Sequence, residues 1–113
     1  MAEPIVRVRD LVVRAGERTL VGPVEFDVHR GAITCLLGRN GCGKTSALRA
    51  ITGLARYGGS VLVHGEESRA LDARVRARRV AYVPQQSLLV AGLPVASVVA
   101  QGRFAATGKV TRL

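Results

Sequence analysis

The 113-residue sequence predicts an α/β protein, and three observations predict it. Segments 5–13 and 24–29 alternate apolar and polar residues with the period of a half-exposed strand. Segment 32–37 is a continuous apolar run, which is typical of a strand covered on both faces. A glycine-rich loop at 38–43 then separates this run from a segment with helical character. A chain of this length allows about one compact domain.

The first two segments indicate an antiparallel sheet with one face in water. In the first strand we expect Val6, Val8 and Val12 to point inward. In the second strand, three apolar residues alternate with three polar ones, and residues 15–18 read as a turn between the two. We therefore expect both strands to use one face for the core. The inward residues of the second strand are Val24, Phe26 and Val28.

The apolar run 32–37 is predicted to be a buried strand, with Cys35 in the core. A helix is expected from Lys44 to about Thr52, with Leu48 and Ile51 inward and with the following glycine, Gly53, ending it. Further along the chain we expect a short strand over 60–63, a helix over 71–79 and a buried strand over 80–83. A last helix is expected over 95–102, with Pro94 in its first turn.

Composition and charge argue against a nucleic-acid-binding, membrane-spanning or secreted protein. The formal charge is +9, from 17 Lys and Arg against 8 Asp and Glu, yet the arginines are scattered and no interleaved aromatic residues point to base stacking. The uncharged stretch 87–101 is too short to span a bilayer, and the N-terminus has no signal-peptide core. Two cysteines make no disulfide framework. We expect a cytoplasmic chain for which nucleic acid is a weaker candidate partner.

Residues 38–45, Gly-Arg-Asn-Gly-Cys-Gly-Lys-Thr, fit the Walker A pattern G-x-x-x-x-G-K-[ST]. Glycines let the backbone N–H groups wrap around an anion, and the next helix adds its positive end. Lys44 would bridge the β- and γ-phosphates, Thr45 would ligate Mg²⁺ and Ser46 would contact the α-phosphate. The predicted nucleotide-binding residues are Gly38, Arg39, Asn40, Gly41, Cys42, Gly43, Lys44, Thr45 and Ser46.

Adenine is favoured over guanine by elimination. Guanine-specific P-loop proteins usually read the base with an Asn-Lys-x-Asp element, and the one asparagine of this sequence, Asn40, lies inside the loop itself. The expected ligand is therefore ATP with Mg²⁺.

With these motifs, the sequence resembles the ATP-binding subunit of an ABC transporter over about residues 5–104. Residues 38–46 resemble the Walker A motif of that family, and residues 80–86, Val-Ala-Tyr-Val-Pro-Gln-Gln, resemble its Q-loop. The resemblance implies that Gln85 contacts Mg²⁺ and the attacking water and couples the ATPase to membrane permease subunits. The loop and the stretch from Gly92 to Phe104 are similar to the branch that imports iron chelates and cobalamin.

The resemblance also implies a fold, an assembly and a location. The fold is a P-loop NTPase with a RecA-like core and an antiparallel β-subdomain, truncated before the Walker B strand. Residues 1–86 would form a partial ATPase core, and residues 87–113 would begin the helical subdomain. In the full-length family the subunit dimerises with another ATPase subunit. It lies at the inner face of the membrane, against the permease subunits.

Departures from the family pattern limit the expected activity. The family stacks an aromatic residue on adenine where this sequence has Ala15. The Leu-Ser-Gly-Gly-Gln signature, Walker B, the catalytic glutamate and the switch histidine are missing, and the last acidic residue is Asp72. Lys44 and Gln85 are the catalytic candidates that remain. We expect a fragment or truncated product with exposed apolar edges, marginal stability and negligible hydrolysis on its own.

Two alternatives remain open from the sequence. One is an ABC ATPase that acts outside transport, which would share the same phosphate-binding loop. The other is a basic module that binds nucleic acid or an acidic partner, in which the loop contacts a phosphate backbone.

Overall fold

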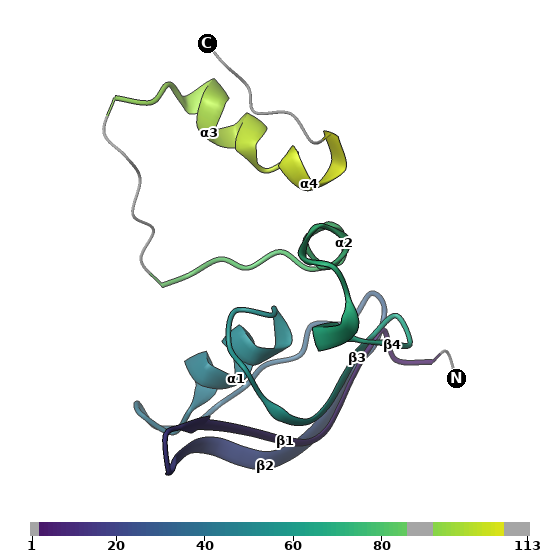
Figure 1. Ribbon diagram of the computed structural model, residues 1–113, viewed down its shortest axis with the longest axis vertical. Helices are drawn as coiled ribbons and strands as arrows, with labels where there is room; N and C mark the ends of the chain where they lie inside the picture. Colours follow the sequence, from purple (N-terminus) through teal and green to yellow (C-terminus); the bar gives the residue numbers. More distant parts are fainter. Residues whose placement is uncertain (1–2, 86–91, 108–113) are drawn as a thin grey trace.

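The computed structural model describes residues 3–85 and 92–107. Among these residues the largest element is a four-stranded antiparallel sheet with the strand order β2-β1-β3-β4. Figure 1 shows the helix α1 (Lys44–Ile51) lying across one face of this sheet. The strands are β1 (Val6–Ala15), β2 (Arg18–Val28), β3 (Gly58–Val63) and β4 (Glu66–Glu67).

Strands β1 and β2 form the hairpin predicted from the alternating segments. Ala15 pairs with Arg18 around a two-residue turn, in which Gly16 has a φ of +60°. Further along, Val8 pairs with Phe26, which packs against the core as expected. The antiparallel pairing is confirmed. Strand β2 begins earlier than predicted, because the pairing continues to the turn itself.

Strand β1 changes its phase at Asp10, so the prediction for Val12 is wrong. Asp10 has a φ of +50°, and the pairing register shifts between Val8 and Leu11. After this bulge Leu11 and Val13 are buried, whereas Val12 is only partly buried. A bulge places one extra residue in the strand and thereby turns the following side chains to the other face.

The core lies between the sheet and α1. Helix α1 contributes Ala47, Ala50 and Ile51, whose spacing of three and four residues makes one helical face. Leu48, predicted to point inward, is 44% exposed, because it lies one position beyond that face. The helix ends as predicted at Gly53, whose φ is +82°. The buried core residues are Val8, Leu11, Val13, Ala47, Ala50, Ile51, Val61 and Val63.

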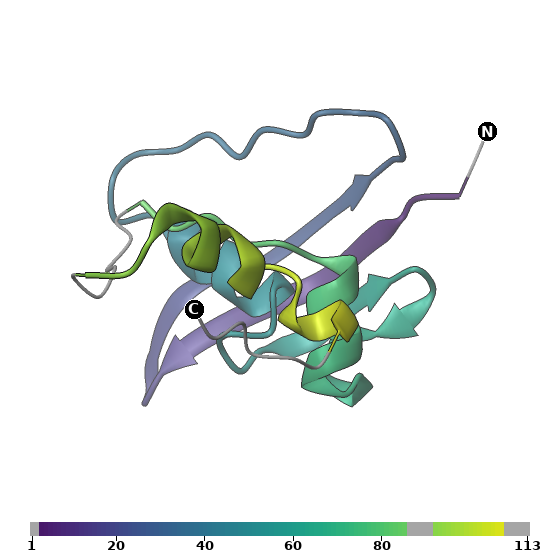
Figure 2. The same ribbon diagram turned by 90° about the horizontal axis from the view of Figure 1, so that it is seen from above.

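The apolar segments 32–37 and 80–83 are not strands, contrary to prediction. Ile33 and Leu37 are 93% and 92% exposed, Cys35 is exposed rather than in the core, and Val83 is 88% exposed. A buried strand needs neighbouring strands at its edges, and none of the described strands pairs with either segment. Figure 2 shows the first segment running in an open course from the end of β2 to α1. Apolar surface is thus exposed, as expected, but on segments without strand pairing and not at the edge of a strand.

The remaining described elements are helical. They are the 3₁₀ turn η1 (Ser68–Ala70) and the helices α2 (Ala73–Arg79), α3 (Val95–Gln101) and α4 (Phe104–Thr107). The helices predicted over 71–79 and 95–102 are therefore confirmed with slightly shorter bounds. In Figure 1, α3 and α4 lie beyond α2, away from the sheet, and the Arg78 guanidinium bonds the carbonyl of Ala106 at 3.4 Å.

No helix in the described ranges is long and apolar enough to cross a membrane. The predicted domain boundary between residues 86 and 87 lies outside the described residues, so that division stays a prediction.

Candidate functional site

The glycine-rich loop turns back on itself immediately before α1. The amide of Cys42 donates to the carbonyl of Arg39 at 3.2 Å, and Gly41 and Gly43 have φ values of +84° and +101°. These left-handed conformations favour glycine, which has no Cβ. A Cβ at Gly43 would lie 2.5 Å from the carbonyl oxygen of Leu20, so the loop lies directly against the β2 backbone.

The start of α1 offers unpaired amide donors. Gly43 is the N-cap, and its carbonyl accepts from the amide of Ala47 at 2.9 Å. The amides of Lys44, Thr45 and Ser46 lie in the first turn, where the helix itself has no carbonyl to pair with them. They add to the positive end of the helix dipole and make this turn suited to an anion.

The side chain of Lys44 folds back over the loop. Its ammonium nitrogen, Nζ, donates to the carbonyl of Gly38 and, at 3.3 Å, to the carbonyl of Arg39. Lys44 and Arg39 are the two cations in residues 38–45, and the Lys44 ammonium is held over the turn whose backbone amides can bind an anion. A phosphate in that turn would meet both an ammonium group and backbone donors.

One cavity of about 460 Å³ joins this turn to the distant Gln85. Three of the predicted residues do not line it: Gly38 and Arg39 contact Lys44 through their carbonyls, and Cys42 lines a separate cavity beside Phe26. The predicted residues that line the cavity are Asn40, Gly41, Gly43, Lys44, Thr45, Ser46 and Gln85.

The charges of the cavity suit a polyanion. Arg18 and Lys44 line it, and none of the described lining residues is acidic. Phosphate groups placed there would meet cations and amide donors without a facing carboxylate, so no like-charge repulsion opposes them.

Sequence reasoning missed the three lining residues of β2, which are Arg18, Thr19 and Leu20. They were missed because the second strand was predicted only from Val24, with a turn over 15–18. The β-branched and apolar run from Thr19 to Val21 was the available signal. Ala15, the position expected to face adenine, does not line this cavity.

A metal ion at this site would meet hard oxygen donors. The Thr45 hydroxyl and the Gln85 side-chain carbonyl line the same cavity, and oxygen ligands are those that Mg²⁺ prefers. The donor set fits Mg²⁺ bound together with phosphate oxygens. The described residues hold no group of three or more His, Cys, Asp or Glu side chains that could bind a metal by themselves.

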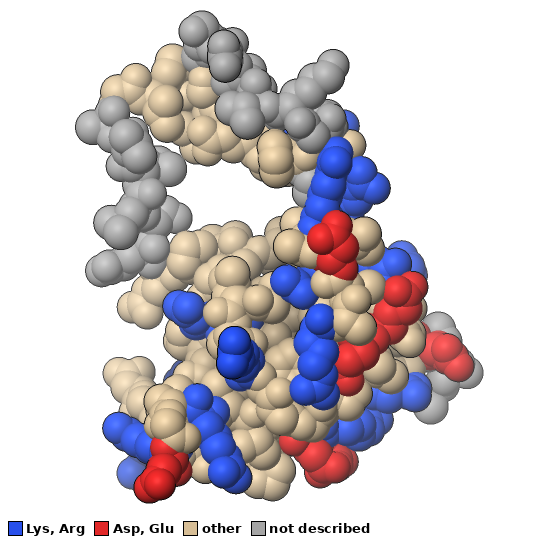
Figure 3. Space-filling view, viewed as in Figure 1, with Lys and Arg blue, Asp and Glu red and all other residues tan. Residues whose placement is uncertain are grey.

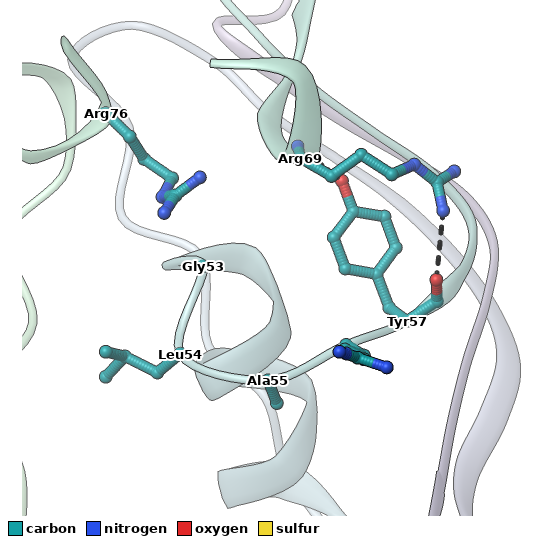
Figure 4. Close-up of a pocket in the computed structure, with 7 residues that line it drawn as sticks. Gly53, Leu54, Ala55, Tyr57, Arg69 and Arg76 are labelled. Atoms are coloured by element: carbon teal, nitrogen blue, oxygen red, sulfur yellow. Dashed lines mark hydrogen bonds between the residues drawn. The ribbon is translucent and has the colours of Figure 1, made fainter. Parts of the chain in front are cut away.

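A second cavity, of about 480 Å³, is lined by three arginines, two of which bond backbone carbonyl groups (Figure 4). Arg69 donates to the carbonyl of Tyr57 at 3.0 Å and stacks over the Tyr57 ring, 4.6 Å from its centre. Arg76 donates to the carbonyls of Ser68, at 3.0 Å, and Leu71, at 3.4 Å. These guanidinium groups tie β3 and α2 to the loops around them. We therefore interpret this cavity as a structural junction between β3, α2 and the loops around them.

Glu67 is the acidic centre of that junction. Its carboxylate accepts from the Tyr57 hydroxyl at 2.9 Å and from the amide of Val61 at 2.8 Å. Burial opposes ionisation of Glu67, but the hydrogen bonds outweigh it and lower the pKa of this carboxyl group. Burial and the bond to Glu67 raise the pKa of Tyr57.

Comparison with known proteins places these motifs in context. A model of the family described as ABC transporter matches residues 21–111. A hemin import ATP-binding protein of Plesiomonas shigelloides is 35% identical over 103 residues, which cover 90% of this chain and 39% of that protein.

Two further relatives have similar coverage. A manganese transport system ATP-binding protein of Halalkalibacterium halodurans is 37% identical over 106 residues, covering 90% of this chain and 40% of that protein. An iron(3+)-hydroxamate import ATP-binding protein of Bacillus subtilis is 32% identical over 90 residues, covering 79% of this chain and 34% of that protein. The chain thus spans well under half the length of the curated relatives it matches.

Proposed function

This chain belongs to the ABC transporter family, and we propose that it carries the Mg-ATP-binding site of an ATP-binding subunit that drives substrate import. The observation that supports this most strongly is the single cavity that unites the glycine-rich loop with Gln85. The loop supplies amide donors and an ammonium group, and Gln85, distant from the loop in sequence, supplies an amide side chain. Phosphoryl transfer depends on this kind of positioned, electrostatic contact.

Each residue has a distinct role in the proposed site. The amides of Gly41 to Ser46 and the Lys44 ammonium hold the phosphates, with Lys44 between the β- and γ-phosphates. Thr45 and Gln85 hold Mg²⁺, which when bound neutralises phosphate charge. Gln85 also orients water toward the terminal phosphate. The described residues of the lining include no carboxylate to accept a proton from that water, so we expect this chain to bind ATP without measurable turnover.

The charge distribution favours this function over nucleic-acid binding. Figure 3 shows Lys and Arg interspersed with Asp and Glu on the face viewed, without one uniform basic stripe. Several arginines are paired with carboxylates, which leaves less cationic surface for a phosphate backbone. These pairs are Arg9–Asp27 at 2.8 Å, Arg79–Glu66 at 3.3 Å and Arg69–Glu67 at 3.5 Å.

A titration of the chain with a fluorescent ATP analogue and Mg²⁺ tests the proposed function. Lys44→Ala removes a charge-assisted contact to phosphate, and we expect it to weaken binding by about ten- to a hundredfold. Arg30→Ala is the matched control, because Arg30 is an exposed cation outside the cavity. Equal affinity of the wild-type and Lys44→Ala chains for Mg-ATP would contradict the proposal. Salt-sensitive DNA binding that Lys44→Ala leaves intact would favour the nucleic-acid alternative.

The proposed partners are integral-membrane permease subunits, reached through the Gln85 region, and a second ATPase subunit. The chain would then lie in the cytoplasm against the inner face of the membrane. The hemin and iron-hydroxamate import proteins among the relatives support import as the process, and the manganese protein supports transport. Co-purification of this chain with permease subunits from detergent-solubilised membranes tests the partnership, and its recovery only in the soluble fraction would contradict it.

A further inference from the structure

The candidate nucleotide cavity extends beyond the phosphate-binding turn to the first residues of β2. Its lining there consists of Arg18, Thr19 and Leu20. Arg18 is exposed, and within residues 3–85 and 92–107 no hydrogen bond or ion pair engages its guanidinium group. A cationic, planar side chain that no described residue engages therefore lines the same cavity as the loop.

The hairpin holds Arg18 in a defined place. Arg18 pairs with Ala15 across the two-residue turn, and its neighbour Thr19 pairs with Arg14. Leu20 packs against the core, and Gly43 of the loop contacts its carbonyl oxygen. The residues that carry Arg18 are thus fixed to the same strand that supports the phosphate-binding turn.

A nucleoside triphosphate needs two kinds of contact. Its phosphates suit the amides of the loop and the Lys44 ammonium. Its purine ring is a flat, weakly polar surface that binds best against another flat group. No aromatic side chain lines the described cavity, and Arg18 brings a flat guanidinium group to it from the first residue of β2. Guanidinium planes stack on rings through cation–π attraction and contact of their faces.

We propose that Arg18 is the base-contacting residue of this site and that its guanidinium stacks on the purine ring of the bound nucleotide. This inference rests on the proposed function, because it requires nucleoside triphosphate phosphates in the loop. Arg18 then binds ligand through the base, whereas Lys44 binds it through the phosphates. The two contacts can be measured separately, because inorganic triphosphate has the phosphates that Lys44 binds and lacks the base that Arg18 binds.

Calorimetric titration with Mg-ATP and, separately, with Mg-tripolyphosphate separates the two contacts. We expect Arg18→Ala to weaken ATP binding by roughly three- to tenfold and to leave tripolyphosphate binding within about twofold of wild type. Arg18→Tyr restores a flat face without a charge, so it is expected to recover ATP affinity. Arg14→Ala is the control, because this exposed arginine of the neighbouring strand lines another cavity.

The other possible outcomes test the role of Arg18 and the proposed function separately. Equal losses of ATP and tripolyphosphate affinity in Arg18→Ala would make Arg18 a phosphate contact and overturn the inference. Unchanged ATP affinity in Arg18→Ala would also overturn it. An effect of Lys44→Ala on both ligands keeps the proposed function intact in either case. A wild-type chain that binds neither ligand would contradict the proposed function and the inference with it.

Discussion

The antiparallel sheet and the segment that joins β2 to α1 have similar apolar residues but opposite surroundings. Val8, Leu11 and Val61 of the sheet are fully buried, whereas Ile33 and Leu37 of the joining segment are more than 90% exposed. Strand β1 has partners on both sides, since a two-residue turn returns β2 onto it and β3, although distant in the chain, pairs with its other edge. The joining segment has no such partner among the described residues.

The difference shows that apolar composition alone does not place a residue in a core. An alternating strand needs one covered face and finds it in a hairpin with a helix above. A continuous apolar run needs strands at its edges and cover on both faces, and both come from residues distant in sequence. Exposure of the joining segment follows from the absence of those neighbours, not from its own residues.

The largest effect expected from this contrast is at Leu11. Leu11→Ala removes a fully buried side chain, so we expect the free energy of unfolding to fall by about 2–5 kcal/mol. Urea unfolding followed by circular dichroism measures it. Val12→Ala is the neighbouring control, with a smaller loss because Val12 is only partly buried. A larger loss at Val12 than at Leu11 would contradict the bulge at Asp10.

An intermediate effect is expected at Glu67, which secures the β3 edge of the sheet. Its pKa is lowered by folding, so the stability it contributes is present above the usual value of 4.5 and is lost as the pH falls through the lower folded pKa. Glu67→Gln should cost about 1 kcal/mol at neutral pH and flatten the acid limb of the stability curve. Unfolding at several pH values tests this, with Glu25→Gln as control. An unchanged acid limb would contradict the assignment.

The smallest effect is expected in the joining segment. Ile33→Ser and Leu37→Ser replace side chains that already face solvent, so the free energy of unfolding should change by less than about 0.5 kcal/mol. The same urea titration measures it. A loss comparable to that of Leu11→Ala would show that this segment is buried in solution and would remove the contrast between the two regions.

Much of the fold could be predicted from local pattern. The hairpin, the helix after the glycine-rich loop and its end at Gly53 follow from alternation, spacing and glycine chemistry. The phase of β1 could not, because the alternation of this segment does not mark the positive φ of Asp10 or the register shift that accompanies it. The predicted strands at 32–37 and 80–83 failed for a related reason, since strand pairing is a property of two segments.

In the candidate site, too, some residues could be predicted from local pattern and others could not. The glycine pattern predicted the turn before α1, because left-handed backbone and close approach to β2 both require glycine at Gly43. Gln85 was found through resemblance, and it lines the same cavity. Arg18 was missed because its place depends on how far the hairpin pairing extends, and the strand-forming run from Thr19 to Val21 was not used to extend it.

The bulge in β1 has a counterpart on the next strand. Gly59 of β3 has a φ of +83°, and a Cβ there would collide with the carbonyl oxygen of Asp10. Any residue larger than glycine at position 59 would therefore displace the bulge at Asp10. Deleting one residue at Asp10 would restore simple alternation and keep Leu11 and Val13 on the buried face with Val8. Homologues that lose the extra residue should accordingly be free of the glycine, and insertions in this strand should appear together with it.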